Sequence, residues 1–168
     1  MHIKPIEQNC SGCTACTFTC PYNAIKMESN QHGFLIPVVD NESCIDCGLC
    51  IKVCPQQNIK ENNKNNQTEK KAYGFINMND DIRSNSTSGG FFLALAKQFI
   101  DCGGYVCGCV LDEFEVKHIV TTDWNAIKRM QGSKYVQSDI AECFPKIAEL
   151  LVKGSSVLLQ EHLARLQD

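Results

Sequence analysis

The chain has 168 residues, of which 43% are hydrophobic and 21% charged, a composition that excludes a disordered tail or a fibre and fits one folded domain or two small ones. Its 16 basic and 19 acidic side chains give a formal charge of −3, so we expect no nucleic-acid partner. No apolar run reaches the ~20 residues that a bilayer requires, and residues 1–9 do not resemble a signal peptide. We therefore expect a cytoplasmic protein with no membrane span.

The cysteine content is the most informative feature of the sequence. The chain has twelve cysteines, and eight of them lie within the first 54 residues. Disulfides are rare in a reducing compartment, so cysteines crowded together there indicate metal ligands.

These eight cysteines form two blocks of the pattern C-x2-C-x2-C-x3-C-P, in which each position of the second block follows its counterpart by 34 residues, as Cys44 follows Cys10. The offset indicates an internal duplication. Three thiolates on one tight loop can take three corners of an iron–sulfur cube, and in two-cluster ferredoxins the fourth cysteine of each block binds the other cluster. Residues 5–60 resemble that bacterial domain. We therefore expect two 4Fe-4S clusters, one bound by Cys10, Cys13, Cys16 and Cys54 and the other by Cys44, Cys47, Cys50 and Cys20.

A zinc-stabilised interaction protein is the alternative for the same cysteines, since two C-x2-C pairs often bind one zinc ion. Zinc needs only four ligands, so the third cysteine of each loop, the cysteine before proline and the second copy would all be surplus. The pattern favours iron–sulfur clusters.

The segment between the two blocks has apolar runs at residues 24–27 and 34–39 on either side of a polar turn, which predicts a hairpin. A domain of about 55 residues buries too little apolar surface to be stable alone, so the clusters should serve as its core and couple metal binding to folding. We predict an α+β ferredoxin-like two-cluster domain over residues 1–56.

Residues 57–71 form a polar run that predicts a linker, and an α/β domain is expected over residues 72–168. Its elements alternate, which predicts a largely parallel or mixed sheet. Asp123 should cap a short helix that ends at residue 130. In chain order we expect a strand at 73–77, a Ser/Gly loop, a helix at 90–101, strands at 105–111 and 118–122, a short helix ending at 130, a polar-edged strand at 132–138, a helix at 145–153 and a strand at 157–159. The helix at 90–101 should bury one face formed by Phe91, Phe92, Leu95, Ala96, Phe99 and Ile100.

Four cysteines lie in this second half and lack the spacing of cluster ligands. They are Cys102, Cys107, Cys109 and Cys143. We expect them to be buried core thiols.

Two polar loops of the second half, at residues 83–90 and 132–138, allow two interpretations. The first loop could be a simple helix cap or, because helix N-termini attract anions, a phosphate-binding turn. The stretches R-S-N-S-T-S-G-G at 83–90, A-L-A at 94–96, G-G-Y-V-C-G at 103–108 and G-S-K-Y-V-Q-S at 132–138, together with His118 and the preceding cysteine blocks, are similar to the coenzyme F-420 hydrogenase/dehydrogenase beta-subunit family.

That resemblance implies a flavin, FAD, which exchanges electrons with the clusters and with a deazaflavin or another acceptor. It also implies a redox partner protein or a further subunit. It places the flavin near Ser88, Gly89, Gly90 and Lys134, and it assigns no catalytic residue.

The end of the chain departs from that family, whose last strand continues as V-L-F-T-G-T-P-C-Q-I-A-G-L, whereas this sequence reads V-L-L-Q-E-H-L-A-R-L-Q-D from residue 157. Inserting one T into a synonymous coding sequence for residues 158–168 restores L-F-T-G-T-P-C-Q-I-A-G. Our hypothesis is that residues 159–168 are a frameshifted tail and that the α/β domain is truncated and incomplete. The alternative is an ordinary amphipathic C-terminal helix.

The sequence thus predicts an iron–sulfur electron-transfer protein that forms the N-terminal part of a flavin-dependent oxidoreductase. The alternative is a non-catalytic ferredoxin-like carrier or partner-binding module.

Overall fold

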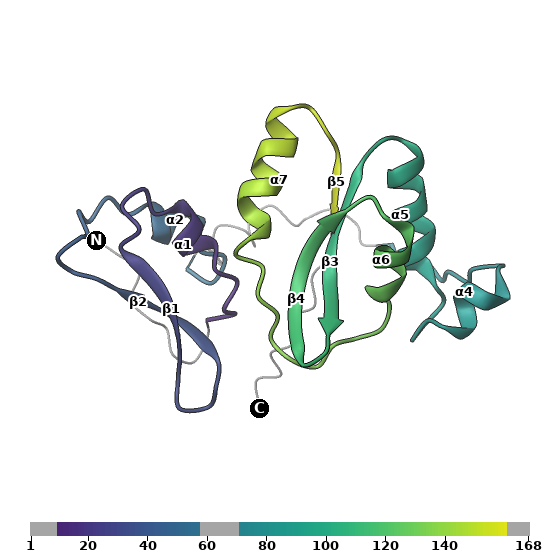
Figure 1. Ribbon diagram of the computed structural model, residues 1–168, viewed down its shortest axis with the longest axis horizontal. Helices are drawn as coiled ribbons and strands as arrows, with labels where there is room; N and C mark the ends of the chain where they lie inside the picture. Colours follow the sequence, from purple (N-terminus) through teal and green to yellow (C-terminus); the bar gives the residue numbers. More distant parts are fainter. Residues whose placement is uncertain (1–9, 58–70, 161–168) are drawn as a thin grey trace. The chain divides into compact units, whose positions relative to one another are not determined.

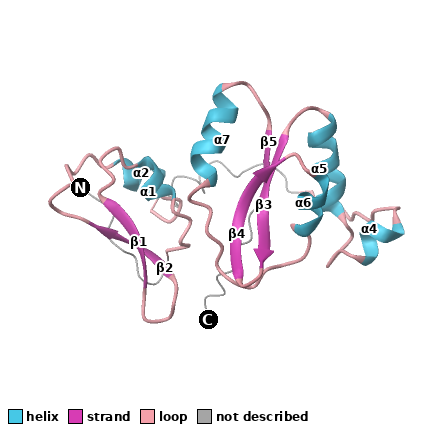
Figure 2. Cartoon of the chain, in the orientation of Figure 1, coloured by secondary structure: helices cyan, strands magenta, loops and turns pink. Residues whose placement is uncertain are grey.

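The computed structural model describes residues 10–57 and 71–160, and the chain divides into two compact units, Met1–Lys70 and Lys71–Asp168 (Figure 1). Both units mix short helices with a small sheet (Figure 2). The predicted linker at 57–71 lies almost wholly outside the described residues. Of the tail hypothesised at 159–168, only residues 159 and 160 are described.

The first unit contains the predicted hairpin. Strand β1 (Ile25–Ser29) pairs antiparallel with β2 (Leu35–Val39) from Ile25↔Val39 to Ser29↔Leu35. The carboxamide oxygen of Asn30 closes the turn, since it accepts hydrogen bonds from the backbone N–H groups of His32 at 2.9 Å and Phe34 at 3.0 Å. Polar turn residues and flanking apolar runs therefore produced the predicted element.

The backbone repeats with the sequence. Helix α1 (Ala15–Thr19) and helix α2 (Leu49–Val53) are both five residues long and lie 34 positions apart. The residue before each helix is left-handed, with φ of 59° at Thr14 and 76° at Gly48. The duplication seen in the cysteines is thus also a duplication of local conformation.

The second unit is built on a three-stranded sheet of order β4-β3-β5. Strand β3 (Tyr105–Asp112) pairs antiparallel with β4 (Glu115–Thr121) and parallel with β5 (Val157–Leu159). The predicted mixed sheet is confirmed.

Helices cover both faces of β3, which is central and buried from Val106 to Val110 (Figure 1). Helices α5 (Phe91–Asp101) and α6 (Trp124–Arg129) pack on the side where Val106 and Val110 lie. Helix α7 (Cys143–Val152) packs on the other side, against Cys107. Because successive side chains of a strand point to opposite faces, β3 supplies both cores.

The segment at 73–77 was wrongly predicted to be a strand. It belongs to neither sheet of the described residues, and Tyr73 is 86% exposed. Its one backbone hydrogen bond to a distant segment runs from the N–H of Asn77 to the carbonyl of Gly89, at 2.7 Å. Phe75 packs edge-on against Phe91 of α5, with ring centroids 5.0 Å apart. The apolar side chain of Phe75 contacts the start of α5. The segment itself has no partner strand among the described residues, and a β-strand needs one.

The predicted strand at 132–138 is also wrong. In its neighbourhood the structure has only an isolated bridge between Lys117 and Asp139, and Tyr135 is 87% exposed. A short helix that was not predicted, α4 (Asp80–Ser84), begins where the side chain of Asn79 accepts the N–H of Ile82.

The other predicted elements are present with shifted ends. Strand β4 begins three residues before the predicted start, and α7 begins two residues before it. The buried face of α5 was partly wrong, because Leu93 and Ala96 are its buried residues whereas Phe91 is 53% exposed. No helix among the described residues has the length and apolar character to cross a membrane.

Candidate metal centres

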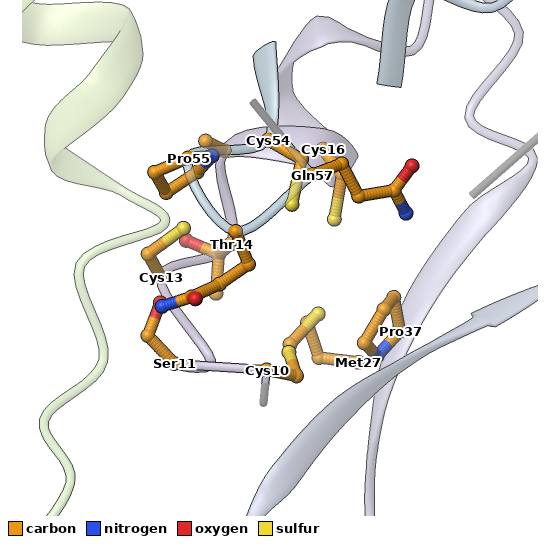
Figure 3. A pocket seen from close by; sticks show the side chains of 12 residues that line it. Cys10, Ser11, Cys13, Thr14, Cys16, Met27, Pro37, Cys54, Pro55 and Gln57 are labelled. Carbon is orange, nitrogen blue, oxygen red and sulfur yellow. The ribbon is translucent and has the colours of Figure 1, made fainter. Parts of the chain in front are cut away.

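A first hollow opens in the first unit between the loop that precedes α1 and the hairpin (Figure 3). Its empty volume, including the open mouth, is about 440 Å³. Cys16 and Cys54 direct their sulfur atoms into it from one side and Cys10 from the opposite side, as Figure 3 shows. The thiol-bearing residues around it are Cys10, Cys13, Cys16 and Cys54.

A second hollow of about 330 Å³ lies beside the loop that precedes α2. Its apolar wall includes Tyr22, Ile25 and Leu49. The thiol-bearing residues around it are Cys20, Cys44, Cys47 and Cys50. The structure therefore places the eight cysteines around two hollows in sets of four, with the same members as the sets that the resemblance to two-cluster ferredoxins implies.

The fourth cysteine of each set comes from the other half of the repeat. Cys20 ends α1 and Cys54 ends α2, and both have an extended backbone, with ψ of 110° and 116°. The N–H of Cys20 binds the carbonyl of Thr17, and that of Cys54 binds the carbonyl of Ile51. Because the chain leaves each helix in an extended conformation, this cysteine lines the hollow of the opposite loop.

Backbone N–H groups already point at sulfur in both sets. Gly12 donates to the Sγ of Cys10, and Ala24 donates to the Sγ of Cys20, each at 3.4 Å. Hydrogen bonds of this kind stabilise negative charge on thiolates and tune the reduction potential of a cluster.

The surroundings of the first loop favour the neutral form of the Cys16 thiol when no cation is bound. Burial raises the pKa of the Cys16 thiol to about 12, and repulsion from Cys13 and Cys10 adds to this effect. Three thiolates could not share so small a loop by themselves, since like charges in a poorly hydrated site disfavour ionisation. Bound iron would supply the positive charge that allows them to ionise.

The donor atoms of each set fit an iron–sulfur group. Within residues 10–57 and 71–160, no three Cys, His, Asp or Glu side chains converge as they would around a single metal ion. The four thiols instead surround a hollow, and thiolates are the ligands that iron–sulfur clusters use. The residues present therefore fit a 4Fe-4S group in each hollow.

Thr14 is a residue of the first hollow whose side chain the sequence analysis did not single out. It is 3% exposed, and its Oγ1 has no hydrogen-bond partner among the described residues. The available signal was the mismatch between Thr14 and Gly48 at matching positions of the repeat.

The four cysteines of the second unit do not join either set. Cys107, Cys109 and Cys143 are buried, as predicted, but Cys102 is exposed at the end of α5, so the prediction was wrong for that residue. A hydrogen bond from Cys107 lowers the pKa of the Cys143 thiol.

The residues predicted to bind flavin have structural contacts of their own. A Cβ on Gly89 would come within 2.0 Å of the Phe75 carbonyl oxygen, and Gly90 begins α5 with φ of 78°. Lys134 donates from its Nζ to the carbonyls of Arg129, Gln131 and Gly132 at 2.9, 2.7 and 3.2 Å. Ser88 is exposed.

The two loops that carry those residues meet. Gln131 donates from its Nε2 to the Oγ of Ser86 at 2.8 Å. Beside this contact lies a polar hollow of about 1140 Å³, open mouth included, that the sequence analysis missed; its walls include Asn79, Trp124, Lys128, Arg129 and Gln131. None of the four predicted flavin residues lines it.

Comparisons with known proteins agree on the first unit. Residues 9–58 match the family described as the 4Fe-4S dicluster domain. A ferredoxin-like protein in the nif region of Sinorhizobium fredii is 36% identical over 61 residues, which cover 33% of this chain and 88% of that protein. The chain belongs to this ferredoxin-like family. The ferredoxin-like unit is accordingly an iron–sulfur unit of the electron-transfer type.

Two larger relatives share the ferredoxin-like unit. A subunit of the ion-translocating oxidoreductase complex of Methanosarcina acetivorans is 35% identical over 54 residues, and the ferredoxin-type protein NapF of Haemophilus influenzae is 36% identical over 50 residues. The match covers 32% and 30% of this chain but only 19% and 28% of those proteins. The chain therefore spans less than a third of the length of either relative.

Proposed function

We propose that the first unit binds two 4Fe-4S clusters and carries electrons between redox partners. One cluster is bound by Cys10, Cys13, Cys16 and Cys54, and the other by Cys20, Cys44, Cys47 and Cys50. The observation that carries this proposal is the grouping of eight thiols around two separate hollows, each with one cysteine from the opposite half of the repeat.

Each cluster supplies the ability to accept and release one electron. The protein binds it through four thiolates, directs the N–H groups of Gly12 and Ala24 at ligand sulfurs, and limits the access of water with apolar side chains such as Met27 and Pro37. At the second hollow a partner could approach over Cys47, which is exposed, and over Tyr22, which is 54% exposed.

The partner is a redox protein or a further component of a redox complex. Support comes from the relative that is named as part of an ion-translocating oxidoreductase complex. An electron carrier needs such a partner because it must receive electrons from one protein and deliver them to another.

Iron and sulfide analysis of variants tests the cluster assignment. After anaerobic purification, the wild-type chain should contain about eight irons and eight acid-labile sulfides. Cys13→Ser and Cys47→Ser should each lose at least one cluster and the order of the first unit, because metal binding and folding are coupled there. The control is Cys102→Ser, which replaces an exposed thiol of the second unit and should keep the full content.

Zinc without sulfide in the wild-type chain would contradict the proposal and favour the zinc-stabilised interaction protein. Full iron content in both single variants, Cys13→Ser and Cys47→Ser, would contradict the ligand assignment.

A second candidate function adds FAD and places the chain in the coenzyme F-420 hydrogenase/dehydrogenase beta-subunit family, as a flavin-dependent oxidoreductase. This candidate rests on the sequence resemblance, and the hydrogen bond between Gln131 and Ser86 is compatible with it because it brings together the segments next to Ser88, Gly89, Gly90 and Lys134. Release of FAD on denaturation, in a ratio near one per chain, would support this candidate. A chain with full iron and no flavin is instead a non-catalytic ferredoxin-like carrier.

A further inference from the structure

The side chain of Thr14 combines three unfavourable features in the wall of the first hollow. Its hydroxyl is buried, with 3% of the residue exposed, and finds no hydrogen-bond partner within the described part of the chain. Its backbone is left-handed, with φ of 59°, although β-branched residues rarely adopt that conformation. A buried hydroxyl without an acceptor costs free energy, so an acceptor absent from the protein alone is expected here.

The matching position of the second loop has none of these features. Gly48 occupies it with φ of 76°, a conformation that glycine adopts without strain, and it offers no hydroxyl. The first loop would therefore form equally well with glycine, and the strained threonine calls for a functional explanation.

Sulfur atoms are the most numerous side-chain acceptors around the hollow, beside the oxygens of Ser11, Gln56 and Gln57. Thr14 lines the same space as the four thiols of the first set, directly after Cys13 in the chain (Figure 3). We propose, on the basis of the proposed function, that the Thr14 hydroxyl donates a hydrogen bond to a sulfur of the cluster in the first hollow. This bond gives that cluster a higher reduction potential than the cluster in the second hollow.

The direction of the effect follows from charge. Reduction adds one electron to the cluster, and a donor aimed at sulfur stabilises the more negative state more than the less negative one. The second cluster lacks this donor because Gly48 stands in its place. The two clusters of a duplicated domain would thus differ in potential through one side chain, which gives electron flow a preferred direction.

The test is a redox titration of the full chain after anaerobic assembly, followed by the electron paramagnetic resonance of the reduced clusters. Thr14→Val keeps the shape of the side chain and removes its hydrogen-bond donor. The equilibrium constant for reduction of one cluster should fall about tenfold, which lowers the midpoint potential of that cluster by about 59 mV for one electron. Thr14→Ser keeps the hydroxyl and should keep that midpoint near the wild-type value. The other midpoint should not move in either variant.

Two further variants make the result specific. Thr14→Gly reproduces the second loop, tolerates the left-handed backbone and should bring the two midpoints closer together. Thr17→Val removes a nearby hydroxyl that already donates to the Thr14 carbonyl at 2.6 Å, and it should leave both midpoints unchanged.

Iron and sulfide counts separate this inference from the proposed function. If the wild-type chain assembles no iron–sulfur clusters, both the proposed function and this inference are overturned. Full counts with unchanged midpoints in Thr14→Val and Thr14→Gly overturn the role of Thr14 alone, as does an equal shift in Thr17→Val. If Thr14→Val loses iron, Thr14→Gly carries the test, and loss of iron in that variant as well would show a structural role in place of the proposed one.

Discussion

Asp123 determines where α6 begins. Its carboxylate accepts the backbone N–H groups of Asn125 at 3.3 Å and Ala126 at 3.1 Å, which would otherwise lack partners in the first turn. This cap was predicted from the sequence because the relevant contacts are local.

We predict that Asp123→Ala lowers the free energy of unfolding of the second unit by about 1 kcal/mol. Urea unfolding followed by the fluorescence of Trp124, the single tryptophan of the chain, measures this change. Asp101→Ala is the control, since Asp101 makes an exposed ion pair with Lys97 that contributes little. Equal losses in the two variants would refute the capping role.

Residues whose role depends on distant neighbours were harder to predict. The eight cysteines could be divided into two sets because the sequence resembles two-cluster ferredoxins, in which the fourth cysteine of each block binds the other cluster. The unpaired hydroxyl of Thr14 and the burial of Leu93 were missed, since both depend on what packs against them. In α5 the run of residues 91–96 is entirely apolar, so the sequence periodicity could not define the buried face.

Among the elements, those with strong signals at both ends were predicted well. Helix α5 follows glycines and ends at Cys102-Gly103, and the hairpin of β1 and β2 surrounds a polar turn. The false strand at 73–77 had β-forming residues but no partner, because strand formation requires pairing that composition does not reveal.

The packing of α5 on β3 should dominate the stability of the second unit. Leu93 is 2% exposed and belongs to the core that includes Val106 and Ile127. We predict that Leu93→Ala costs about 2–5 kcal/mol through lost burial and a cavity. The same fluorescence-detected unfolding measures it.

Lys97→Ala is the matched control on the exposed face of α5, and it should change stability by less than about 1 kcal/mol. A loss in Leu93→Ala no greater than that of the control would show that α5 is not packed as described.

On the scale of the molecule, the two units should respond separately to the loss of metal. We predict that destroying the clusters with ferricyanide and a chelator abolishes the order of the first unit. The apolar core of its described residues is small, with Ala24, Ile25 and Pro37 buried beside Cys16 and Cys50. The second unit has its own cores on both faces of β3 and should keep its urea midpoint. Circular dichroism measures the first effect and Trp124 fluorescence the second.

A shift of the Trp124 midpoint on cluster removal would show instead that the second unit depends on the first. Iron content is measured in parallel, so that an incomplete reaction is recognised.

Under the proposed function, the exchange of Cys20 and Cys54 between the halves of the repeat should make assembly of the first unit cooperative. Each hollow is completed only when the opposite loop is in place, so partly loaded chains should be scarce relative to empty and fully loaded ones. Oxidative damage at one loop would likewise release a thiol that the opposite hollow uses, and a population under oxygen stress would divide into intact and apo chains with few intermediates.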